Sequence, residues 1–301
     1  MKLPIPLELN GVDFRTHSVM GVFALHDKIV FLHRILGDVP QENITKDTVF
    51  PQYIVADFFS SDFAQHTQDF LVYREKRTLF ATCCHYEPTA GGILLNTMHY
   101  QPSGGALNLT RDDALAKLVE IRGGSLAEVG ESPDPQEKVF SEQKTFSFLG
   151  LHVKMSSKFI MECRSQATDD VVWTLRLNAW LYTDIEERDG ILYFGTAGRG
   201  GRFYGVSATD GRVLFAYDTG GTTSYTWYKN DVLLSDRTGR IIILDAKSGS
   251  ERKAIKFKHP DNPRQKLSVC SGLLVENGKV YAVGRPVKNF YDFYALCANL
   301  L

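Results

Sequence analysis

Residues 204–221 read YGVSATDGRVLFAYDTGG, and this stretch decides the fold. Two short runs of β-branched and aromatic residues flank the polar turn SATDG, which is the pattern of two antiparallel strands joined by a tight turn. The phrase recurs 42 residues upstream as SQATDDVVW (165–173) and 38 residues downstream as DAKSGSERK (245–253). A turn phrase that returns at a period of about 40 residues indicates repeated units of one architecture.

Each unit also carries a second turn, one strand pair earlier. Asn, Asp and Gly tolerate the positive φ that a tight hairpin requires. The turns that we predict on this basis are Asp189-Gly190, Asn230-Asp231 and Asn277-Gly278. Each unit therefore reads as four short antiparallel strands, which describes the blade of a propeller. A β-sandwich is the alternative, but sandwiches do not repeat a turn phrase at a constant interval.

The first half of the chain is less regular. We predict further hairpins at residues 25–28, 74–77 and 156–158. The one stretch of helical composition is residues 110–121 (TRDDALAKLVEI). A period of about 43 residues gives seven blades, with six as the alternative. The sequence thus predicts an all-β chain, a single β-propeller domain over residues 1–301.

Closure of the ring needs one more strand, because the last repeat strand, YALCA (294–298), lies close to the C-terminus. Residues 2–9 alternate apolar and other residues and can supply that strand. We expect them to complete the blade formed by residues 266–301. The propeller would then be closed by pairing of its N- and C-terminal strands, which leaves no open sheet edge.

The repeat resembles a known family. Residues 192–196 (LYFGT) and the phrase at 204–221 are similar to the pyrroloquinoline-quinone-like repeat, which typically reads LYfGT followed by YALDAxTGkvlWxydTGG. The resemblance covers residues 171–298. It implies a docking tryptophan at the end of each phrase, and the residues in that place are Trp173, Phe215 and Lys253. The girdle of tryptophans between blades is therefore incomplete here.

Composition restricts the functional classes. The net charge is −1 and the isoelectric point is near 6.7, which argues against a nucleic-acid binder because such proteins carry a basic excess. No run approaches the roughly 18 apolar residues of a membrane helix, and no apolar segment typical of a secretory signal follows Lys2. Five scattered cysteines fit a reducing compartment. We expect a cytoplasmic protein with neither a membrane nor a nucleic acid as partner.

Cys83 and Cys84 are adjacent, and this pair raises the question of a cofactor. Quinoprotein alcohol dehydrogenases resemble this chain in repeat type and carry an adjacent-cysteine disulfide stacked on the quinone. Those enzymes are exported and much longer, and the residues that hold their calcium cannot be located here. Alternation along the strand predicted at residues 79–84 also points one thiol inward and the other outward. We therefore expect structural cysteines and no cofactor.

Other chemical motifs are weak. The glycine-rich stretch 195–202 (GTAGRGGR) precedes another strand, whereas a phosphate loop precedes a helix, so it predicts a hairpin loop. The histidines form no cluster with Cys or Asp at metal-ligand spacing. They are His17, His26, His33, His66, His85, His99, His152 and His259. We predict no metal site and no catalytic residues.

Charge on the loops gives the one candidate site. Loops between the second and third strands of successive units carry cations, and in a propeller these loops emerge on one face. The predicted partner-binding residues, called the basic arc below, are Arg199, Arg202, Arg237, Arg240, Arg285 and Lys288. Turns on the opposite face are acidic, with Glu186, Glu187, Asp189, Asp231 and Glu276. Weaker candidates for a contact core are Trp180, Tyr182, Trp227 and Tyr228.

These observations favour a non-enzymatic binding module. The expected partner is another protein with an acidic surface, steered electrostatically onto one loop face. An inhibitor or immunity protein is one form that such a module can take. The alternative is an enzyme, either a degenerate quinoprotein-like dehydrogenase or a hydrolase with its site in the central channel.

Overall fold

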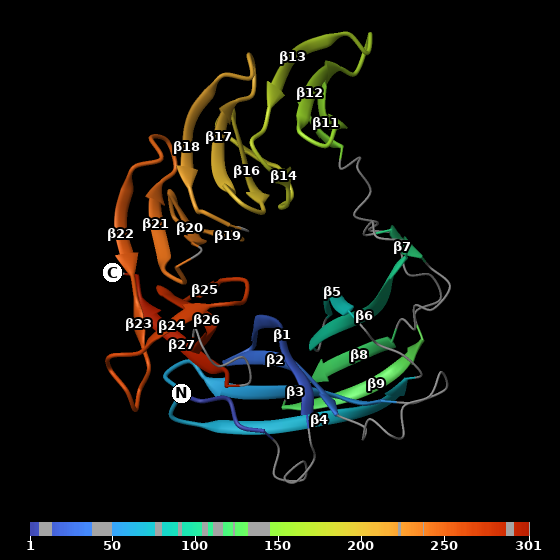
Figure 1. Ribbon diagram of the computed structural model, residues 1–301, viewed down its shortest axis with the longest axis vertical. Helices are drawn as coiled ribbons and strands as arrows, with labels where there is room; N and C mark the ends of the chain where they lie inside the picture. The colour runs from blue at the N-terminus through green and yellow to red at the C-terminus, as the bar shows by residue number, and fades with distance from the viewer. Residues whose placement is uncertain are drawn as a thin grey trace. The chain divides into compact units, whose positions relative to one another are not determined.

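The computed structural model describes residues 1–5, 14–37, 50–75, 80–89, 92–103, 108–110, 117–122, 124–131, 145–221, 224–236, 238–286 and 292–300. Within these residues the secondary structure is β, and no helix is long and apolar enough to cross a membrane. The chain divides into two compact units (Figure 1). The first unit is Met1–Val139 with Tyr281–Cys297, and the second is Phe140–Val280 with Ala298–Leu301.

The described strands form six antiparallel sheets of four or five strands. The first is β1 (Phe14–Leu25), β2 (Lys28–Gly37), β3 (Phe50–Ser60) and β4 (His66–Glu75), in that order. The second has the order β5 (Phe80–Thr89), β6 (Gly92–Ser103), β8 (Lys117–Arg122) and β9 (Ser125–Glu131), with β7 (Asn108–Thr110) beside β6. The third is β10 (Phe146–Phe148), β11 (Leu151–Ser157), β12 (Ile160–Ser165) and β13 (Val171–Arg176).

The last three sheets contain the clearest repeats. The fourth has the order β14 (Trp180–Leu181), β16 (Ile191–Ala197), β17 (Arg202–Ser207) and β18 (Val213–Asp218), with β15 (Glu186–Arg188) beside β16. The fifth is β19 (Tyr225–Tyr228), β20 (Asp231–Ser235), β21 (Ile241–Asp245) and β22 (Glu251–Ile255). The sixth has the order β23 (Phe257–Lys258), β24 (Lys266–Val269), β26 (Lys279–Pro286) and β25 (Leu274–Glu276), with β27 (Tyr294–Asn299) beside β26. The all-β prediction is confirmed, while the blade number and the single domain stay predictions.

Most predicted hairpins are confirmed. Leu25 pairs with Lys28. A hairpin turn also joins β11 to β12, but it lies at residues 158–159, after the predicted 156–158, because Ser157 pairs with Ile160. Asp189 and Gly190 have φ of 52° and 78°, as a tight turn between twisted strands requires. The turn predicted at Asn230-Asp231 lies one residue earlier, because Tyr228 pairs with Asp231 and Lys229 takes the positive φ.

One predicted hairpin is wrong, and one stretch of helical composition forms a strand where it is described. Residues 76 and 77 of the hairpin predicted at 74–77 lie outside the described residues, but β4 ends at Glu75 in the first sheet and β5 begins at Phe80 in the second, so these two strands do not pair as a hairpin requires. The helical composition of residues 110–121 does not give a helix where the chain is described, since residues 117–122 form β8. Pairing with β6 and β9 decides the conformation of this segment against its local propensity.

The repeat extends to individual backbone hydrogen bonds in the second unit. The amides of Asp169, Gly211 and Gly249 donate to the carbonyls of Ser165, Ser207 and Asp245, at 2.9, 3.0 and 2.8 Å. The residue after each acceptor donates to the preceding hairpin turn. These bonds run from Gln166, Ala208 and Ala246 to Gly150, Gly190 and Asn230, at 2.9, 2.9 and 3.3 Å. The three sheets are therefore copies of one blade at the level of the backbone.

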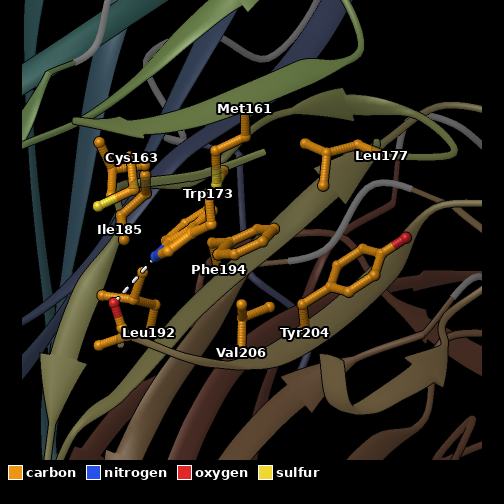
Figure 2. Packing of buried hydrophobic residues seen from close by; sticks show 11 residues of the cluster. Met161, Cys163, Trp173, Leu177, Ile185, Leu192, Phe194, Tyr204 and Val206 are labelled. Carbon is orange, nitrogen blue, oxygen red and sulfur yellow. Dashed lines mark hydrogen bonds between the residues drawn. The ribbon is translucent and has the colours of Figure 1, made fainter. Parts of the chain in front are cut away.

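Trp173 docks the third sheet on the fourth. Figure 2 shows the Trp173 ring among the buried side chains of this core. The indole Nε1 donates to the Ala208 carbonyl at 3.0 Å, and the ring lies over the turn at Gly211. A Cβ at Gly211 would approach the ring to 2.6 Å, and φ there is +70°, so the contact requires glycine. Apolar side chains around the indole complete this core. They include Met161, Cys163, Leu192, Phe194 and Val206.

Phe215 occupies the same place between the fourth and fifth sheets. Its ring lies over Gly249, where a Cβ would approach it to 2.3 Å. Phenylalanine has no indole N–H, but the Tyr193 hydroxyl donates to the Ala246 carbonyl at 3.1 Å. Ala246 corresponds to Ala208 in the repeat, so Tyr193 and Phe215 together replace a docking tryptophan. The girdle of tryptophans is incomplete in sequence, but at this position its contacts are retained.

The terminal segments pair within the first unit. Lys2 forms an antiparallel bridge with Tyr294, and the Leu3 amide donates to the Phe293 carbonyl at 2.8 Å. The Ala295 amide donates to the Met1 carbonyl at 2.7 Å. Leu3 is 1% exposed. Pairing of the terminal segments is thus confirmed for residues 1–3, and residues 6–9 of the predicted strand lie outside the described residues.

Candidate functional site

Strand direction sorts the loops of the fourth sheet onto two edges. β16 runs from the turn at Asp189-Gly190 toward the loop at residues 198–201, and β17 returns from that loop. Antiparallel pairing therefore places residues 198–202 at one edge and the turns that begin β16 and β18 at the other. Arg199 and Arg202 are both exposed at the first edge, called the loop edge below.

Side-chain hydrogen bonds fix the loop that carries these arginines. The Asn178 side chain donates to the Gly200 carbonyl and accepts a hydrogen bond from the Tyr204 hydroxyl at 2.6 Å. The Thr219 hydroxyl donates to the Gly201 carbonyl at 2.8 Å. A Cβ at Gly201 would lie 2.0 Å from the Gly221 carbonyl oxygen, so the two segments approach as closely as glycine allows. The guanidinium groups thus stand on a rigid loop, which reduces the entropy lost when they bind.

Two exposed aromatic side chains lie beside this loop. Trp180 is 46% exposed and Tyr182 is 43% exposed. Trp180 pairs with Ala197 across β14 and β16, at the base of the loop. The Lys158 Nζ lies 4.3 Å from the centroid of the Trp180 ring, a cation–π contact that adds a further positive charge to the loop edge.

The remaining members of the basic arc divide three ways. Arg240 forms an ion pair with Asp236 at 2.7 Å, and the same carboxylate accepts from the Arg240 amide at 2.9 Å, so this arginine stabilises its own loop. Arg285 is half-buried and belongs to the first unit, whereas Arg199 and Arg202 belong to the second. Arg237 and Lys288 lie outside the described residues. Among described residues, Arg199 and Arg202 therefore carry the prediction.

The acidic turns have internal partners. The Glu186 carboxylate accepts from the Trp227 indole at 2.6 Å, and the Arg188 guanidinium lies 3.6 Å from the centroid of the same indole. Glu187 accepts from the Gly190 amide at 2.7 Å, and Asp231 lies 3.3 Å from Arg252. These acids stabilise turns and the packing of the Trp227 ring, which makes them weaker candidates for a partner than the loop edge.

A second cluster, in the first unit, was not predicted from the sequence. His17 on β1, His33 on β2, Asp57 on β3 and His66 on β4 form one hydrogen-bonded chain, called the histidine network below. His17 Nε2 lies 2.6 Å from His33 Nδ1, and His33 Nε2 lies 2.8 Å from Asp57 Oδ2. His66 Nε2 lies 2.7 Å from Asp57 Oδ1. The expectation that the histidines do not cluster is therefore wrong for these three.

The centre of this network is buried. His33 and Asp57 are both fully buried, and the Gln68 amide adds a third donor to Asp57 at 2.7 Å. Burial by itself raises the pKa of the Asp57 carboxyl, but the hydrogen bonds from His33 and His66 outweigh burial and leave that pKa below its ordinary value. Asp57 is thus a carboxylate whose charge is satisfied by neighbouring N–H groups.

Three of the five cysteines have described side chains. Cys83 and Cys84 lie in β5, as the predicted strand requires, but their side chains are outside those described. Cys163, Cys270 and Cys297 are not in disulfide bonds, and Cys163 is buried. Burial raises the pKa of Cys163 to about 11. Among the described residues, no group of three or more His, Cys, Asp or Glu is arranged to hold a metal ion.

Comparison with known proteins supports the repeat. Residues 161–288 match a family model of the pyrroloquinoline-quinone-like type described as outer membrane protein assembly factor BamB. No curated protein sequence matches the chain. Together with the antiparallel sheets of four or five strands, the match supports a propeller-type fold.

Solved structures align at low identity. The WD40 β-propeller domain of Doa1 aligns with a TM-score of 0.45 and 14% identity, over 99% of this chain and 95% of that one. BamB from Moraxella catarrhalis aligns with a TM-score of 0.38 and 10% identity, over 90% of this chain and 96% of that one. The computationally designed Ika8 protein aligns with a TM-score of 0.38 and 7% identity, over 91% and 82%.

Proposed function

We propose that this chain, whose residues 161–288 belong to the pyrroloquinoline-quinone-like repeat, is a protein-binding propeller that docks an acidic protein surface on the loop edge of its second unit. The observation that carries the proposal is the pair Arg199 and Arg202. Both are exposed on a loop that Asn178 and Thr219 hold in place.

Charge and surface chemistry support the acidic partner. Arg199, Arg202 and Lys158 bring three cations to one edge of the second unit. Asp218 pairs with Arg202 across β17 and β18, but its carboxylate caps the Gly220 amide at 2.8 Å. Charges of one sign at the rim of an interface act mainly on the rate of association.

The exposed aromatic side chains supply binding energy at the centre of the contact, whereas the charges act mainly on the association rate. Trp and Tyr are enriched among the residues that contribute most to protein interfaces. Trp180 and Tyr182 are each more than two-fifths exposed, although large aromatic side chains are usually buried. We assign them to the centre of the contact and the cations to its rim.

Photo-crosslinking tests the location of the contact. A benzoylphenylalanine in place of Tyr182 should capture the partner in cells, and one in place of Asp189, on the other edge of the same sheet, should not. The captured partner is then identified by mass spectrometry and purified. Capture from residue 189 alone would place the interface on the acidic turns and contradict the proposal.

Association kinetics then test the charges. Replacing Arg199 and Arg202 together by Ala should lower the association rate by about tenfold at low salt and flatten its salt dependence, with little effect on dissociation. Arg212→Ala is the matched control, because Arg212 is exposed on the opposite edge of the same sheet. Equal rates for the double variant and wild type at low and high salt would refute the role of the loop edge.

A further inference from the structure

The histidine network joins four strands of one sheet to both terminal segments. The strands lie side by side in the order β1-β2-β3-β4 (Figure 1). At one end the His17 ring packs edge-on against Phe293, with centroids 4.3 Å apart. Near Asp57, the Gln68 amide also donates to the Pro4 carbonyl at 2.9 Å. Phe293 in turn accepts the amide of Leu3, so the network adjoins the pairing of residues 1–3 with residues 293–295.

Hydrogen-bond geometry limits how many protons the network can hold. Asp57 accepts from His33 Nε2, so a neutral His33 has only Nδ1 left as an acceptor, and His17 Nε2 must donate to it. One added proton on this pair is tolerated, because the imidazolium of His33 can donate to His17 after a change of tautomer. A second proton is not, since it sets two N–H groups against each other across 2.6 Å.

We propose that the histidine network is a proton-binding site that controls the terminal pairing of the first unit: a second proton on the His17–His33 pair expels His17 and releases residues 1–3 from residues 293–295. Histidine titrates between about pH 5 and pH 8 in ordinary surroundings, which sets the pH range of the test below. This inference is independent of the proposed partner, because it concerns residues of the first unit alone.

Other ionisable groups near these strands do not replace the network. Arg34 and Asp69 point to the opposite face of the sheet, because neighbouring residues of a strand alternate between faces. On the terminal segments, Lys2 and Asp292 form an ion pair at 2.6 Å. In the β3–β4 turn the Asp62 carboxylate accepts from Ser60, and the Tyr281 hydroxyl donates to the Ser61 carbonyl.

The N-terminal amine needs separate treatment. It donates to the Ala295 carbonyl at 2.9 Å, and burial lowers its pKa. A lowered amine pKa means that the charged amine is less stable in the paired state, so acid weakens the pairing through this group as well. The amine is present in every variant below, and only the difference between variants reports on the network.

Hydrogen exchange followed by mass spectrometry on the full chain tests the proposal. Peptides that cover residues 1–5 and 292–297 are compared between pH 8 and pH 5, after correction for the intrinsic pH dependence of exchange. If opening takes up one proton, protection falls by up to about tenfold per pH unit over the acidic part of this range. Peptides of β20 and β21 in the second unit are the internal reference.

His17→Gln separates the network from the amine. A glutamine side chain can donate to His33 or accept from it after rotation, so it tolerates either charge state. This variant should keep the neutral-pH protection of wild type and lose most of its acid response. His26→Asn is the matched control, because His26 lies in the β1–β2 turn outside the network and asparagine tolerates its φ of 53°.

Three results would overturn the proposal. The first is an acid response of wild type no larger at the termini than in β20 and β21. The second is the full wild-type response in His17→Gln, or its loss in His26→Asn. The third is a zinc effect: Zn²⁺ added alone at pH 7.5 increases the hydrogen-exchange protection of the terminal peptides in wild type but not in His17→Gln. That result would identify the network as a metal site. The wild-type comparison stands even if a variant fails to fold.

Discussion

Trp173→Phe tests whether the docking ring stabilises the second unit through its hydrogen bond as well as its bulk. Trp173 is 7% exposed and Ala208, whose carbonyl it binds, is 2% exposed. Loss of the indole N–H leaves that carbonyl without this donor, which costs about 1–3 kcal/mol in a buried position. The smaller ring leaves space in the core and adds on the order of 1 kcal/mol. We expect a loss of about 2–4 kcal/mol in the free energy of unfolding of the second unit.

Tryptophan fluorescence in urea measures this loss without interference from the first unit. The three tryptophans of the chain, Trp173, Trp180 and Trp227, all lie in the second unit. Two remain in the variant and report its unfolding. With a denaturant dependence of about 2 kcal/mol per molar urea, the midpoint should fall by about 1–2 M.

The neighbouring sheet supplies a rescue. In the repeat, Val153 of the third sheet corresponds to Tyr193 of the fourth, so a Trp–Val pair in one blade stands where the next has Phe–Tyr. Adding Val153→Tyr to Trp173→Phe should restore a donor to the Ala208 carbonyl and recover about 1–2 kcal/mol. Tyr193→Phe should cost a similar amount, whereas Tyr182→Phe, at an exposed ring, is the neutral control. A Trp173→Phe midpoint within 0.2 M of wild type, about 0.4 kcal/mol by the same slope, would refute the reasoning.

Two further predictions use the same unit. Gly249→Ala should destabilise the second unit by about 1–3 kcal/mol, because φ is +68° and the new Cβ would meet the Phe215 ring at 2.3 Å. Gly272→Ala is the control and should leave the stability unchanged, because a Cβ there has no atom within 4 Å. Equal urea midpoints for the two variants would contradict this prediction. Cys163, whose pKa burial raises to about 11, should resist iodoacetamide at pH 8 while the exposed Cys270 is alkylated, and equal labelling of the two in peptide mass spectra would show that Cys163 is not buried.

The repeated half of the chain was predictable because its signals are local. A hairpin turn such as Asp189-Gly190 needs positive φ at both residues. Asp and Gly are among the residue types that adopt positive φ most readily, so the sequence predicts the turn. The phrase at residues 207–211 fixes one turn and one set of backbone bonds wherever it recurs. Residues 110–121 show the opposite case, since their composition favours a helix and their pairing partners make residues 117–122 a strand.

The histidine network could not be predicted from the sequence, because the register between strands brings its residues together. That register depends on contacts between residues far apart in the sequence. The turn at residues 25–28 sets the register of β1 against β2, but an irregularity between Val19 and Gly21 shifts it by one residue. His17 then lies opposite Ile35 and comes diagonal to His33. Asp57 lies opposite Phe31, a pairing set by strands far apart in sequence. Alternation along each strand could show which residues share a face, but not which of them meet.

The docking contacts explain why the repeat weakens in sequence without failing in structure. The blade needs a flat ring over a glycine turn and a donor for one alanine carbonyl, and tryptophan supplies both from one residue. In the fourth sheet Phe215 supplies the ring and Tyr193 the donor, from two strands. Lys253, at the same position of the fifth sheet, is exposed and supplies no such ring. A comparison of sequences treats Phe215 and Lys253 alike, as positions where the tryptophan is missing. In the structure Phe215 keeps the ring contact with the glycine turn, whereas Lys253 is exposed. What the repeat retains is therefore a hydrogen bond to the alanine carbonyl and a ring packed on the glycine turn. Because two residues can share these roles, they have to be looked for in pairs of positions.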